Sequence, residues 1–517
     1  MFAEPVEPIS SSGGTAKLVK LFSKTPDHDI SRYLVGKDIS HARGEPAFYE
    51  KMRRILAARE SRHWRIFDFM LQYHGIHKLS YGISTSHTGS SYFIAMENLL
   101  DGMREPRLVD IKLGSVTSER SWFGKSCFAA WRIRQIDKVT NSDKEGFRLE
   151  GIDNPPDQLV SMAPPVTHAK ASQRLLYQRL QAKDFLSYFL TFDPKMDSDF
   201  VEIISPLELK MGFLLDLISQ LARLMWSVES IPAPQKWIGS SLVLVIDTDQ
   251  SISRASWAQR PPGLKIRLLD WGRSELLDQE DWTTASAWVR ADRIRAWTRY
   301  RSAVSRMVFE SMHLYYRLFV EDSPLDSVVL DIFDYDSITQ DDFIGSITIS
   351  LRVSPMTRYL IATGQDRTSV DDAAVYIAIT RVSLNSDIAS FYRVRVMGAR
   401  NLPRMDLLPG RSSDPYVRVR SRGGVEFGRS SVCQTTRDPN WDAVIDVPMT
   451  DAGRERSKLL TALQESTPPG FALQPFTSEV VDRLFHGPQS CAESDANASL
   501  LRSLFLPPVE VQTRLSK

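Results

Sequence analysis

Cysteine is scarce in this chain of 517 residues. Cys127, Cys433 and Cys491 are widely separated and odd in number, which argues against a disulfide framework and against a zinc cluster. Such cysteine usage is typical of a reducing compartment, so we expect a cytoplasmic protein, with a peripheral membrane or nuclear location as alternatives. The N-terminal stretch MFAEPVEPISSSGG has no basic region followed by an apolar core, so it does not resemble a secretory signal.

An excess of one charge is also missing. Lys and Arg together number 64 and Asp and Glu 63, so the net charge is +1. No global field would therefore attract nucleic acid, and we expect no nucleic-acid partner. A charged ligand must be bound by a local cluster of side chains.

No hydrophobic run is long enough to span a bilayer. The most apolar segment, residues 211–226, is interrupted by Asp216 and Arg223, whereas a membrane-spanning helix needs about 20 mostly apolar residues. We therefore expect no transmembrane segment and predict a buried helix here. Hydrophobic residues make up 42% of the chain, which is ample for a globular protein of two to four domains.

The pattern along the chain predicts four regions. Residues 1–28 are rich in Ser, Gly and Pro and are expected to form a flexible leader. Residues 29–322 mix helical and strand patterns, and residues 323–450 change to short alternating strands between acidic and Pro/Gly turns, which is typical of a β-sandwich. Residues 451–517 carry scattered Pro and Ser and are predicted to be largely disordered. The expected fold class is α+β with two lobes, followed by an all-β sandwich.

One short stretch, EPRLVDIKLGS at residues 105–115, places Asp110 and Lys112 two positions apart on a predicted strand. Residues two apart on a strand point to the same side, so the carboxylate and the ammonium share one face. A half-exposed ion pair on an edge strand would explain this spacing alone. Two further predicted strands follow at residues 240–247 and 264–271, and Asp270 stands at the end of the second.

A helix rich in basic residues is predicted directly after this stretch, with Arg120, Lys125, Arg132, Arg134 and Lys138 along it. A compact, highly charged anion needs several Lys and Arg side chains on fixed elements. The helix could line such a pocket, or it could present an ordinary solvated face.

PRLVDIKLG fits the Pro-x-x-x-Asp-x-Lys-x-Gly signature and resembles the inositol polyphosphate kinase family, in particular its inositol hexakisphosphate kinases. Other segments are similar to landmarks of that family and occur in the family's order over about residues 30–320. They are GEPAFYEKM with Glu45, FIAMENLL before the signature, EGFRLEGI, GSSLVLVID and IRLLDWG with Asp270.

The resemblance implies an ATP- and Mg²⁺-dependent kinase that phosphorylates an inositol polyphosphate. Phosphoryl transfer needs positioning, a metal and cations around the transferred group. Asp110 would accept the proton of the hydroxyl, Lys112 would steady phosphate charge, and Asp270 would hold Mg²⁺. Residues implied to bind the nucleotide are Lys37, Glu45, Glu97, Asn98, Ser240 and Ser241, and residues implied to bind the substrate are Lys125, Arg132, Arg120, Arg134 and Lys138.

The sequence departs from the family in two places. Its metal motif reads Leu-Asp-Trp-Gly rather than Ile-Asp-Phe-Ala, and the aspartate-glycine-tyrosine segment near the family's C-terminus is not recognisable. Substrate and regiochemistry therefore stay open. A catalytically inactive scaffold that binds inositol phosphates or lipids and responds to calcium is the alternative. A usual protein or lipid kinase is disfavoured, since neither a Gly-x-Gly-x-x-Gly loop nor a His-Arg-Asp loop is present.

The β-rich region resembles a C2 domain, but its halves occur in reversed order. VVLDIFDYDSITQDDFIGSITISL looks like the second half of that fold, and it precedes RVRVMGARNLPRMDLLPGRSSDPYVRVRS, which looks like the first. Either one permuted sandwich or two truncated copies would explain this order. The short segment SLNSDIAS would join the old ends, and permutation is tolerated where chain ends lie close.

The resemblance to C2 domains also implies a Ca²⁺ site and recruitment to an anionic phospholipid surface. Five carboxylates crowded on two loops would need a cation, and Ca²⁺ takes six to eight oxygen ligands. An acidic cluster on a calcium-independent, protein-binding sandwich is the alternative. The implied ligands are Asp334, Asp336, Asp342, Asp406 and Asp414.

Overall fold

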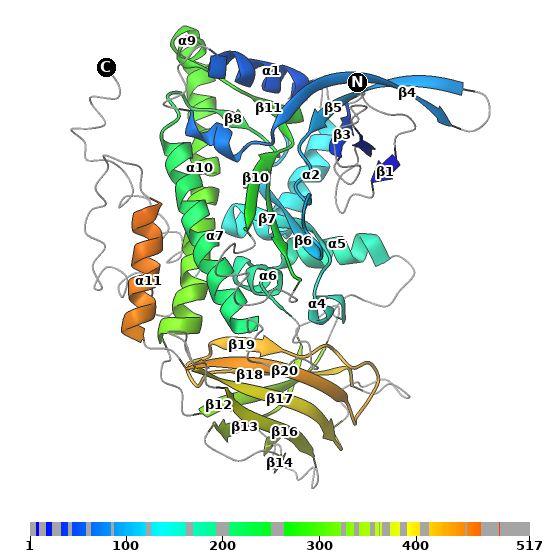
Figure 1. Ribbon diagram of the computed structural model, residues 1–517, viewed down its shortest axis with the longest axis vertical. Helices are drawn as coiled ribbons and strands as arrows, with labels where there is room; N and C mark the ends of the chain where they lie inside the picture. The colour runs from blue at the N-terminus through cyan, green and yellow to red at the C-terminus, as the bar shows by residue number, and fades with distance from the viewer. Residues whose placement is uncertain are drawn as a thin grey trace.

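The computed structural model shows an upper α+β part and a lower β-sandwich, joined at the end of a long helix (Figure 1). The fold class expected from the sequence is confirmed. The structure describes residues 7–9, 17–22, 33–39, 44–57, 64–83, 87–119, 126–161, 169–192, 206–249, 263–321, 327–335, 341–351, 357–360, 362–363, 373–382, 390–403, 413–449, 452–466 and 485.

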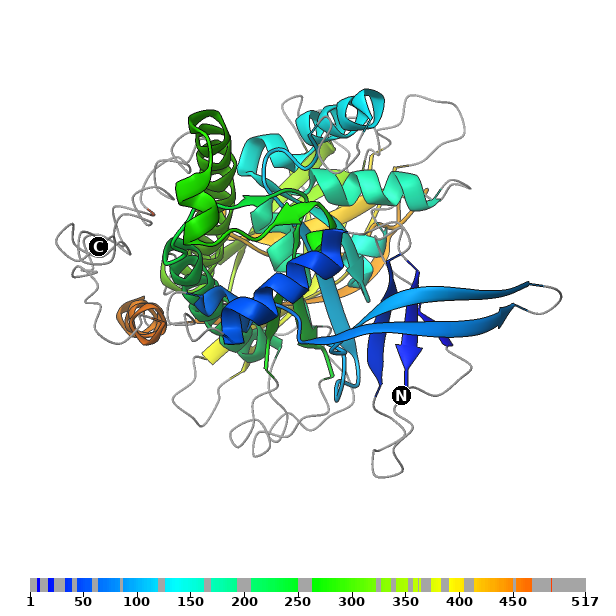
Figure 2. The ribbon, with the colours of Figure 1, turned by 90° about the horizontal axis from the view of Figure 1, so that it is seen from above.

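The first sheet is antiparallel and has the order β1-β2-β3-β5-β4. Its strands are β1 (Glu7–Ile9), β2 (Leu18–Leu21), β3 (Leu34–Asp38), β4 (Tyr73–Ile83) and β5 (His87–Met96). The β4–β5 ribbon reaches well beyond the rest of the molecule (Figure 2). The predicted flexible leader is wrong for β1 and β2: Val19 and Leu21 are buried against Phe93, which ties this segment to the sheet.

The second sheet lies at the centre of the upper part and has the order β10-β9-β6-β7. Its strands are β6 (Pro106–Leu113), β7 (Phe147–Asp153), β9 (Ser241–Asp247) and β10 (Lys265–Leu269), and all neighbours are antiparallel. In β6 the side chains alternate, so that Val109 and Ile111 enter the core on the face opposite to Asp110. A short ribbon pairs β8 (Lys236–Trp237) with β11 (Ser274–Glu275).

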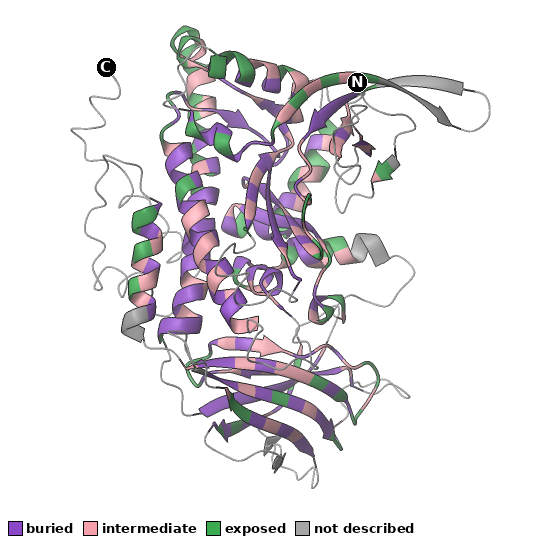
Figure 3. Cartoon of the chain, viewed as in Figure 1, coloured by how far each residue is buried: buried purple, intermediate pink, exposed green. Residues whose placement is uncertain are grey.

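Helices surround this sheet, and α7 and α10 pack side by side along it (Figure 1). They are α1 (Gly44–Ala57), α2 (Cys127–Val139), α3 (Asn141–Glu145), α4 (Asp157–Ser161), α5 (Ala169–Arg179), α6 (Ala182–Phe189), α7 (Pro206–Glu229), α9 (Gln279–Thr284) and α10 (Ala287–Tyr316). Single turns lie at Arg65–Phe69, Trp271–Arg273 and, after α10, Arg317–Glu321. Figure 3 shows that α7 is largely buried, as is the second half of α10 from Ala303 on.

The predicted buried helix at residues 211–226 is present and longer than expected, since α7 begins at Pro206 and ends at Glu229. Among the described residues, one helix is long enough and apolar enough to cross a membrane, judged by length and composition alone, and this helix is α7. In this structure, however, 67% of its most apolar window is buried inside the protein. Leu214, Leu217 and Leu221 are fully buried in the core, as in the central helix of a globular domain.

The lower part is a single sandwich of two antiparallel sheets. One has the order β15-β13-β12-β18-β19 and the other β14-β16-β17-β20. Their strands are β12 (Ser327–Asp334), β13 (Asp342–Ser350), β14 (Thr357–Leu360), β15 (Ala362–Thr363), β16 (Ala374–Val382), β17 (Ser390–Arg400), β18 (Pro415–Arg420), β19 (Glu426–Arg429) and β20 (Asn440–Met449).

Both halves of the reversed sequence contribute to each sheet. Strand β12 pairs with β18 over Val329–Asp334 and Pro415–Arg420, and β16 pairs with β17 across the junction between the halves. The two halves therefore form one sandwich, whereas two truncated copies would each pair within themselves. That this sandwich is a permuted C2 domain stays a prediction.

After the sandwich the chain returns to the helical part. Helix α11 (Ala452–Glu465) packs against α7, and the hydroxyl of Tyr315 donates to Glu455 Oε2 at 2.7 Å. Phe485 is also buried and stacks on Tyr316. The prediction of a largely disordered tail over residues 451–517 is therefore wrong for α11, whose apolar Leu459 and Leu463 are fully buried.

Candidate active site

Strand register brings the predicted catalytic residues together at one end of the central sheet. Lys112 on β6 lies opposite Ser241 on β9, and Ser241 in turn lies opposite Leu269 on β10. Asp270 directly follows Leu269. Directly paired residues project to the same face of a sheet, so Lys112 and Ser241 lie side by side next to the end of β10.

These residues form a continuous polar chain. Lys112 Nζ donates to Ser241 Oγ at 2.8 Å and to Asp270 Oδ2 at 2.6 Å. Lys37 Nζ, on β3, lies 2.6 Å from Asp270 Oδ1 and 2.8 Å from Glu45 Oε2 on α1. We call Glu45, Lys37, Asp270 and Lys112 the ion-pair chain. It joins β3 and α1 to β6 and to the end of β10.

The backbone at Asp270 explains how its carboxylate reaches both lysines. Its φ of 67° and ψ of 57° lie in the left-handed region, where a non-glycine residue is uncommon. The turn is held by Trp271, which is fully buried and stacks on Phe48 of α1 with ring centroids 4.4 Å apart. The aromatic residue in the unusual Leu-Asp-Trp-Gly motif thus anchors the turn that presents the carboxylate.

Burial and opposite charges together set the pKa values of the residues in the ion-pair chain. Burial by itself raises the pKa of Asp270, but Lys112 and Lys37 outweigh it and hold that pKa well below its usual range. Burial lowers the pKa of Lys37, and Asp270 and Glu45 reverse this effect so that its pKa is raised. For Glu45, which is almost fully buried, burial dominates and its pKa is raised.

Asp110 lies two residues before Lys112 on the same face of β6, opposite Val243 of β9. Its Oδ1 atom is buried and has no hydrogen-bond partner among the described residues. Burial raises the pKa of Asp110, and the attraction of Lys112 offsets this only in part. An unpartnered buried carboxylate oxygen costs free energy, so it is suited to accept a proton or a hydrogen bond from a ligand.

A second buried network, whose residues were not predicted as functional from the sequence, supports β6 from its other neighbour, β7. Arg148, opposite Lys112 in the register, contacts Asp137 of α2 and lies 2.7 Å from Glu150 Oε1. Glu150 also accepts from Arg174 of α5 at 2.7 Å. The sequence could have indicated this network, because Arg148 and Glu150 of EGFRLEGI stand two apart on one predicted strand and so share a face.

The residues predicted to meet a nucleotide divide into two groups. One group lies at the ion-pair chain: Lys37 and Glu45 belong to it, and Ser241 contacts Lys112. Ser240 is buried beside it, and its backbone carbonyl accepts the N–H of Leu113 at 3.1 Å. Glu97 is engaged elsewhere: it pairs with Arg267 at 2.9 Å and accepts the N–H of Gln72. Asn98 accepts the N–H of Leu100 at 3.1 Å, which closes its own turn.

The predicted basic helix is shorter than expected, since α2 begins at Cys127. Arg132, Arg134 and Lys138 are exposed on it, and the structure does not bring them into the ion-pair chain. Arg120 and Lys125 lie outside the described residues. The buried side of α2 instead presents Asp137 to Arg148, and Phe128 and Trp131 stack on its exposed side.

Residues 93–292 match the sequence model of the inositol polyphosphate kinase family. Residues 311–363 and 391–462 match the model of the C2 domain. The chain therefore carries an inositol polyphosphate kinase domain and a C2 domain. The kinase match includes Asp110, Lys112, Ser241 and Asp270, and the two-part C2 match spans both halves of the sandwich.

Two solved structures are similar in part to this chain. The crystal structure of inositol phosphate multikinase Ipk2 from S. cerevisiae, in complex with ADP and Mn²⁺, is 16% identical, with a TM-score of 0.32, and covers 51% of this chain and 98% of its own. A second inositol phosphate multikinase structure, from a study of its structure and engineering, is also 16% identical, with a TM-score of 0.30, and covers 50% of this chain and 96% of its own. The search of curated proteins found no match.

In the C2 domain, three of the predicted calcium ligands lie at one end of the sandwich. Asp334 pairs with Asp342 across β12 and β13 and accepts the N–H of Asp414 at 2.5 Å. Asp414 Oδ1 accepts the N–H of Thr435 at 2.6 Å. No group of three acidic, His or Cys side chains able to hold a metal is found among the described residues. Asp336 and Asp406 lie outside them, so the five-ligand site stays a prediction.

Proposed function

We propose that the protein is an ATP-dependent kinase that phosphorylates an inositol polyphosphate. The observation that carries the proposal is the polar face on which Asp110, Lys112, Ser241 and Asp270 meet within the residues matched by the kinase family. Phosphoryl transfer asks little covalent chemistry of a protein, and it depends on positioned cations, a metal ligand and an acceptor for one proton. This face offers each of these.

Asp110 is proposed to orient the acceptor hydroxyl and take its proton, because its Oδ1 is buried and unpartnered within the described chain. Its raised pKa brings it closer to that of a useful proton acceptor at neutral pH. Lys112 would hold the transferred phosphoryl group, since its ammonium stands on the same strand face and is preoriented by Ser241.

The residues present are compatible with ATP and Mg²⁺. Asp270 is ionised and a third of its side chain is exposed, which suits a single carboxylate ligand of Mg²⁺ beside phosphate oxygens and water. The metal would neutralise charge on the phosphates. Lys37, at present paired with Asp270 and Glu45, is the proposed lysine for the nucleotide phosphates, with Glu97 and Asn98 proposed beside the base and ribose.

For the substrate, we propose a pocket that includes the basic residues on and before α2. Arg132, Arg134 and Lys138 are exposed and therefore free to reorient toward an anion. Arg120 and Lys125, in the segment before α2, would complete the set. Their number suits a compact ligand with several phosphates.

The C2 domain is proposed to bring the kinase to an anionic phospholipid surface when it binds Ca²⁺. Bound cations would turn an acidic sandwich tip into one that attracts lipid headgroups. The proposed ligands are Asp334, Asp336, Asp342, Asp406 and Asp414. The corresponding location is cytoplasmic and peripheral to a membrane.

The test is incubation of the purified protein with ATP and Mg²⁺ and a panel from inositol trisphosphate to hexakisphosphate, followed by product analysis. We expect one or more members to be phosphorylated, and Asp110→Asn and Asp270→Asn each to remove the activity with unchanged circular dichroism. Asp143→Asn, an exposed acid on α3, is the matched control. Absence of turnover across the panel would reject the proposal.

A second candidate function is a catalytically inactive scaffold that binds inositol phosphates or lipids and responds to calcium. It is favoured by one observation: both carboxylate oxygens of Asp270 already bind lysines, so a metal would have to displace Lys37 or Lys112. Thermal stabilisation by an inositol phosphate without consumption of ATP would support the scaffold.

A further inference from the structure

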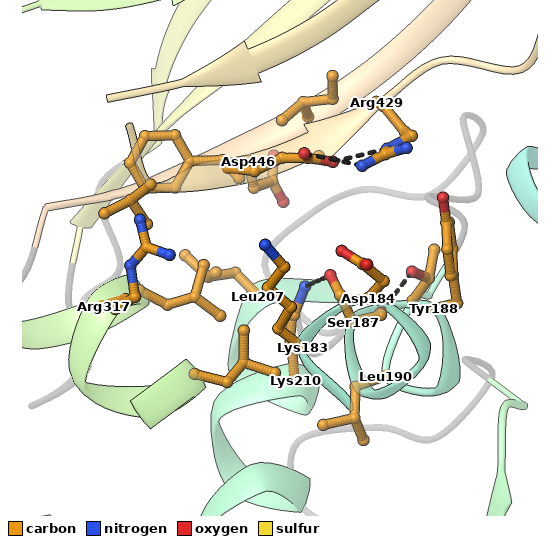
Figure 4. A pocket seen from close by; sticks show the side chains of 18 of the residues that line it. Lys183, Asp184, Ser187, Tyr188, Leu190, Leu207, Lys210, Arg317, Arg429 and Asp446 are labelled. Atoms are coloured by element: carbon orange, nitrogen blue, oxygen red, sulfur yellow. Dashed lines mark hydrogen bonds and ion pairs between the residues drawn. The ribbon is translucent and has the colours of Figure 1, made fainter. Parts of the chain in front are cut away.

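A cavity of about 230 Å³ lies at the seam between the kinase domain and the C2 domain. One wall is formed by α6, α7 and the turn after α10, and the other by β18, β19 and β20. Figure 4 shows Lys183 and Lys210 on the helical wall below Arg429 and Asp446 of the C2 sheet. None of its lining residues belongs to the ion-pair chain or to the Asp110 face.

Both walls are held in place by contacts within the chain. Arg107 of β6 donates to the backbone carbonyls of Tyr188 and Phe189 at 3.2 and 3.1 Å, which holds the end of α6 on the central sheet. The seam is closed by the guanidinium of Arg429, which lies 5.6 Å from the ring centroid of Tyr188. The N–H of Val432 also donates to Ser161 of α4 at 3.0 Å. The cavity is therefore a preformed space between two docked domains.

Positive charge exceeds negative charge around this cavity. Its lining includes five Lys and Arg residues and three acids: Lys183, Lys210, Arg317, Arg418 and Arg429 against Asp184, Glu426 and Asp446. Burial and the nearby cations lower the pKa of His313, also in the lining, to about 3, so it adds no charge at neutral pH.

The cations and acids of the C2 wall are already matched. Arg429 donates to both carboxylate oxygens of Glu426 at 2.6 and 2.8 Å, and Arg418 lies 3.1 Å from Asp331. Asp446 accepts two hydrogen bonds from Arg393 at 2.8 and 2.9 Å. The unmatched charge therefore lies on the helical wall.

The helical wall carries three lining cations, Lys183, Lys210 and Arg317, and one lining acid, Asp184. Arg317 lies 3.7 Å from Glu321 Oε2. Among the described residues, no carboxylate forms an ion pair with Lys183 or Lys210. Lys210 Nζ donates to the hydroxyl of Ser187 at 3.2 Å. Burial lowers the pKa of Lys210 to about 8, and the charge of Glu426 offsets this only in part. A partly buried ammonium that forms no ion pair is costly even with the charge of Glu426 nearby, and an anion in the cavity would reduce that cost.

We propose that the cavity binds a small anion bearing phosphate groups, which Lys183 and Lys210 hold between the two domains. Phosphate oxygens accept strong hydrogen bonds from ammonium groups, and Arg317 would add to the attraction. A volume near 230 Å³ is below the roughly 300–1,000 Å³ of pockets for drug-sized ligands, so the occupant is compact. Because the cavity lies between the two walls, an anion held there by the helical wall is expected to stabilise the docked arrangement.

The experiment measures the Tm of the full chain with sodium pyrophosphate against sodium chloride at equal ionic strength. We expect pyrophosphate to raise the Tm by about 2–4 °C, and Lys183→Met with Lys210→Met to abolish that shift. Lys144→Met, an exposed lysine on α3, is the matched control and should keep it. Equal shifts in the wild type and the double variant would overturn the proposal.

Two further arms separate folding and active-site effects. Lys183→Met alone alters only an exposed side chain, so a reduced shift in this variant supports the site even if the double variant does not fold. In Lys112→Met, pyrophosphate should still raise the Tm, because the cavity does not involve the ion-pair chain. This rise in Tm should still be lost when Lys183 is also replaced by Met. The seam proposal therefore stands or fails independently of kinase activity.

A third arm distinguishes a soluble anion from a lipid headgroup. Full-length protein is sedimented with phosphatidylcholine vesicles containing phosphatidylinositol bisphosphate, and with phosphatidylserine vesicles of equal charge. Binding to the bisphosphate vesicles that the double variant loses and Lys144→Met retains would identify a phosphorylated headgroup as the source. If the double variant alters neither the Tm shift nor this binding, the proposal is wrong.

Discussion

Lys112 Nζ and Asp270 Oδ2 lie 2.6 Å apart although the two residues are 158 positions apart in the sequence. The contact crosses from β6 over β9 to the end of β10, and Lys37 binds the other oxygen of the same carboxylate at 2.6 Å. One carboxylate thus pairs with two lysines. If a polyphosphate binds here as proposed, it would take over one of the lysines and free Asp270 for a metal.

Replacing Asp110 by Asn should remove activity without loss of stability. The substitution deletes a proton acceptor, for which about a 100- to 10,000-fold fall in kcat is expected. It also removes a buried carboxyl group whose pKa is raised because burial disfavours its charged form. The free energy of unfolding should therefore stay equal or increase. Steady-state kinetics and urea unfolding measure the two effects. A clear loss of stability in Asp110→Asn would show that its carboxylate is structural.

Lys112→Met should lower kcat by about 100- to 1,000-fold, because the cation is expected to stabilise charge that develops on the transferred phosphoryl group. It should also lower the free energy of unfolding, since Asp270 loses one of its two cations. Lys51→Met breaks comparable contacts with Asp278 and Asp281 outside the site and is the matched control. If both variants keep full activity, Lys112 has no catalytic role.

Glu145 should make the stability of the protein depend on pH near neutrality. Burial and the nearby Glu310 raise its pKa to about 7, although Asn141 and the N–H of Ala182 partly offset this. The unfolded chain ionises Glu145 near its ordinary pKa of about 4.3, so the folded state binds more protons between that pH and 7. Stability from this group is therefore full below about pH 4.3 and is lost as pH rises through 7.

Glu145→Gln should flatten this part of the stability profile, measured by urea unfolding from pH 5 to 8. Gln keeps an oxygen that can accept the N–H of Ala182, and it cannot ionise. At pH 8 the variant is expected to be more stable than the wild type by about 1–3 kcal/mol. An unchanged slope would mean that Glu145 does not titrate in this range.

The docking of α11 should respond to the loss of a single hydroxyl. Tyr315→Phe leaves the buried carboxylate of Glu455 without its 2.7 Å hydrogen bond, for which about 1–3 kcal/mol of destabilisation is expected. Thr461→Val, on the exposed side of α11, should change stability by less than about 0.5 kcal/mol. Equal effects of the two variants would argue against a specific role for the Tyr315 contact.

Calcium binding can be tested with Asp334→Asn, which keeps an oxygen to accept the N–H of Asp414. If the five aspartates bind Ca²⁺, the wild type should sediment with anionic liposomes in a calcium-dependent way and the variant should bind more weakly. Asp438→Asn, at an exposed turn of the same domain, is the control. Liposome binding that is indifferent to calcium would favour the calcium-independent sandwich.

Elements with strong local patterns were predictable. The strands β6 and β9 and the buried helix α7 follow from local apolar patterns: partial alternation in β6 and continuous apolar runs in β9 and α7. The predictions failed where long-range packing decides. Strands β1 and β2 lie in a Ser- and Gly-rich segment, and they form because Val19 and Leu21 reach the distant Phe93. Helix α11 depends in the same way on contacts with α7 and Tyr315.

In the candidate site, too, local contacts were predictable from the sequence and long-range contacts were not. The sequence by itself determined that Asp110 and Lys112 share a face, because side chains two apart on a strand must, and that Asp270 ends a strand. Only the tertiary structure decided that Lys37 and Glu45 join Asp270, that Glu97 turns to Arg267, and that Arg132 lies apart from the ion-pair chain. Strand register and domain docking set these contacts, and both depend on residues far apart in the chain.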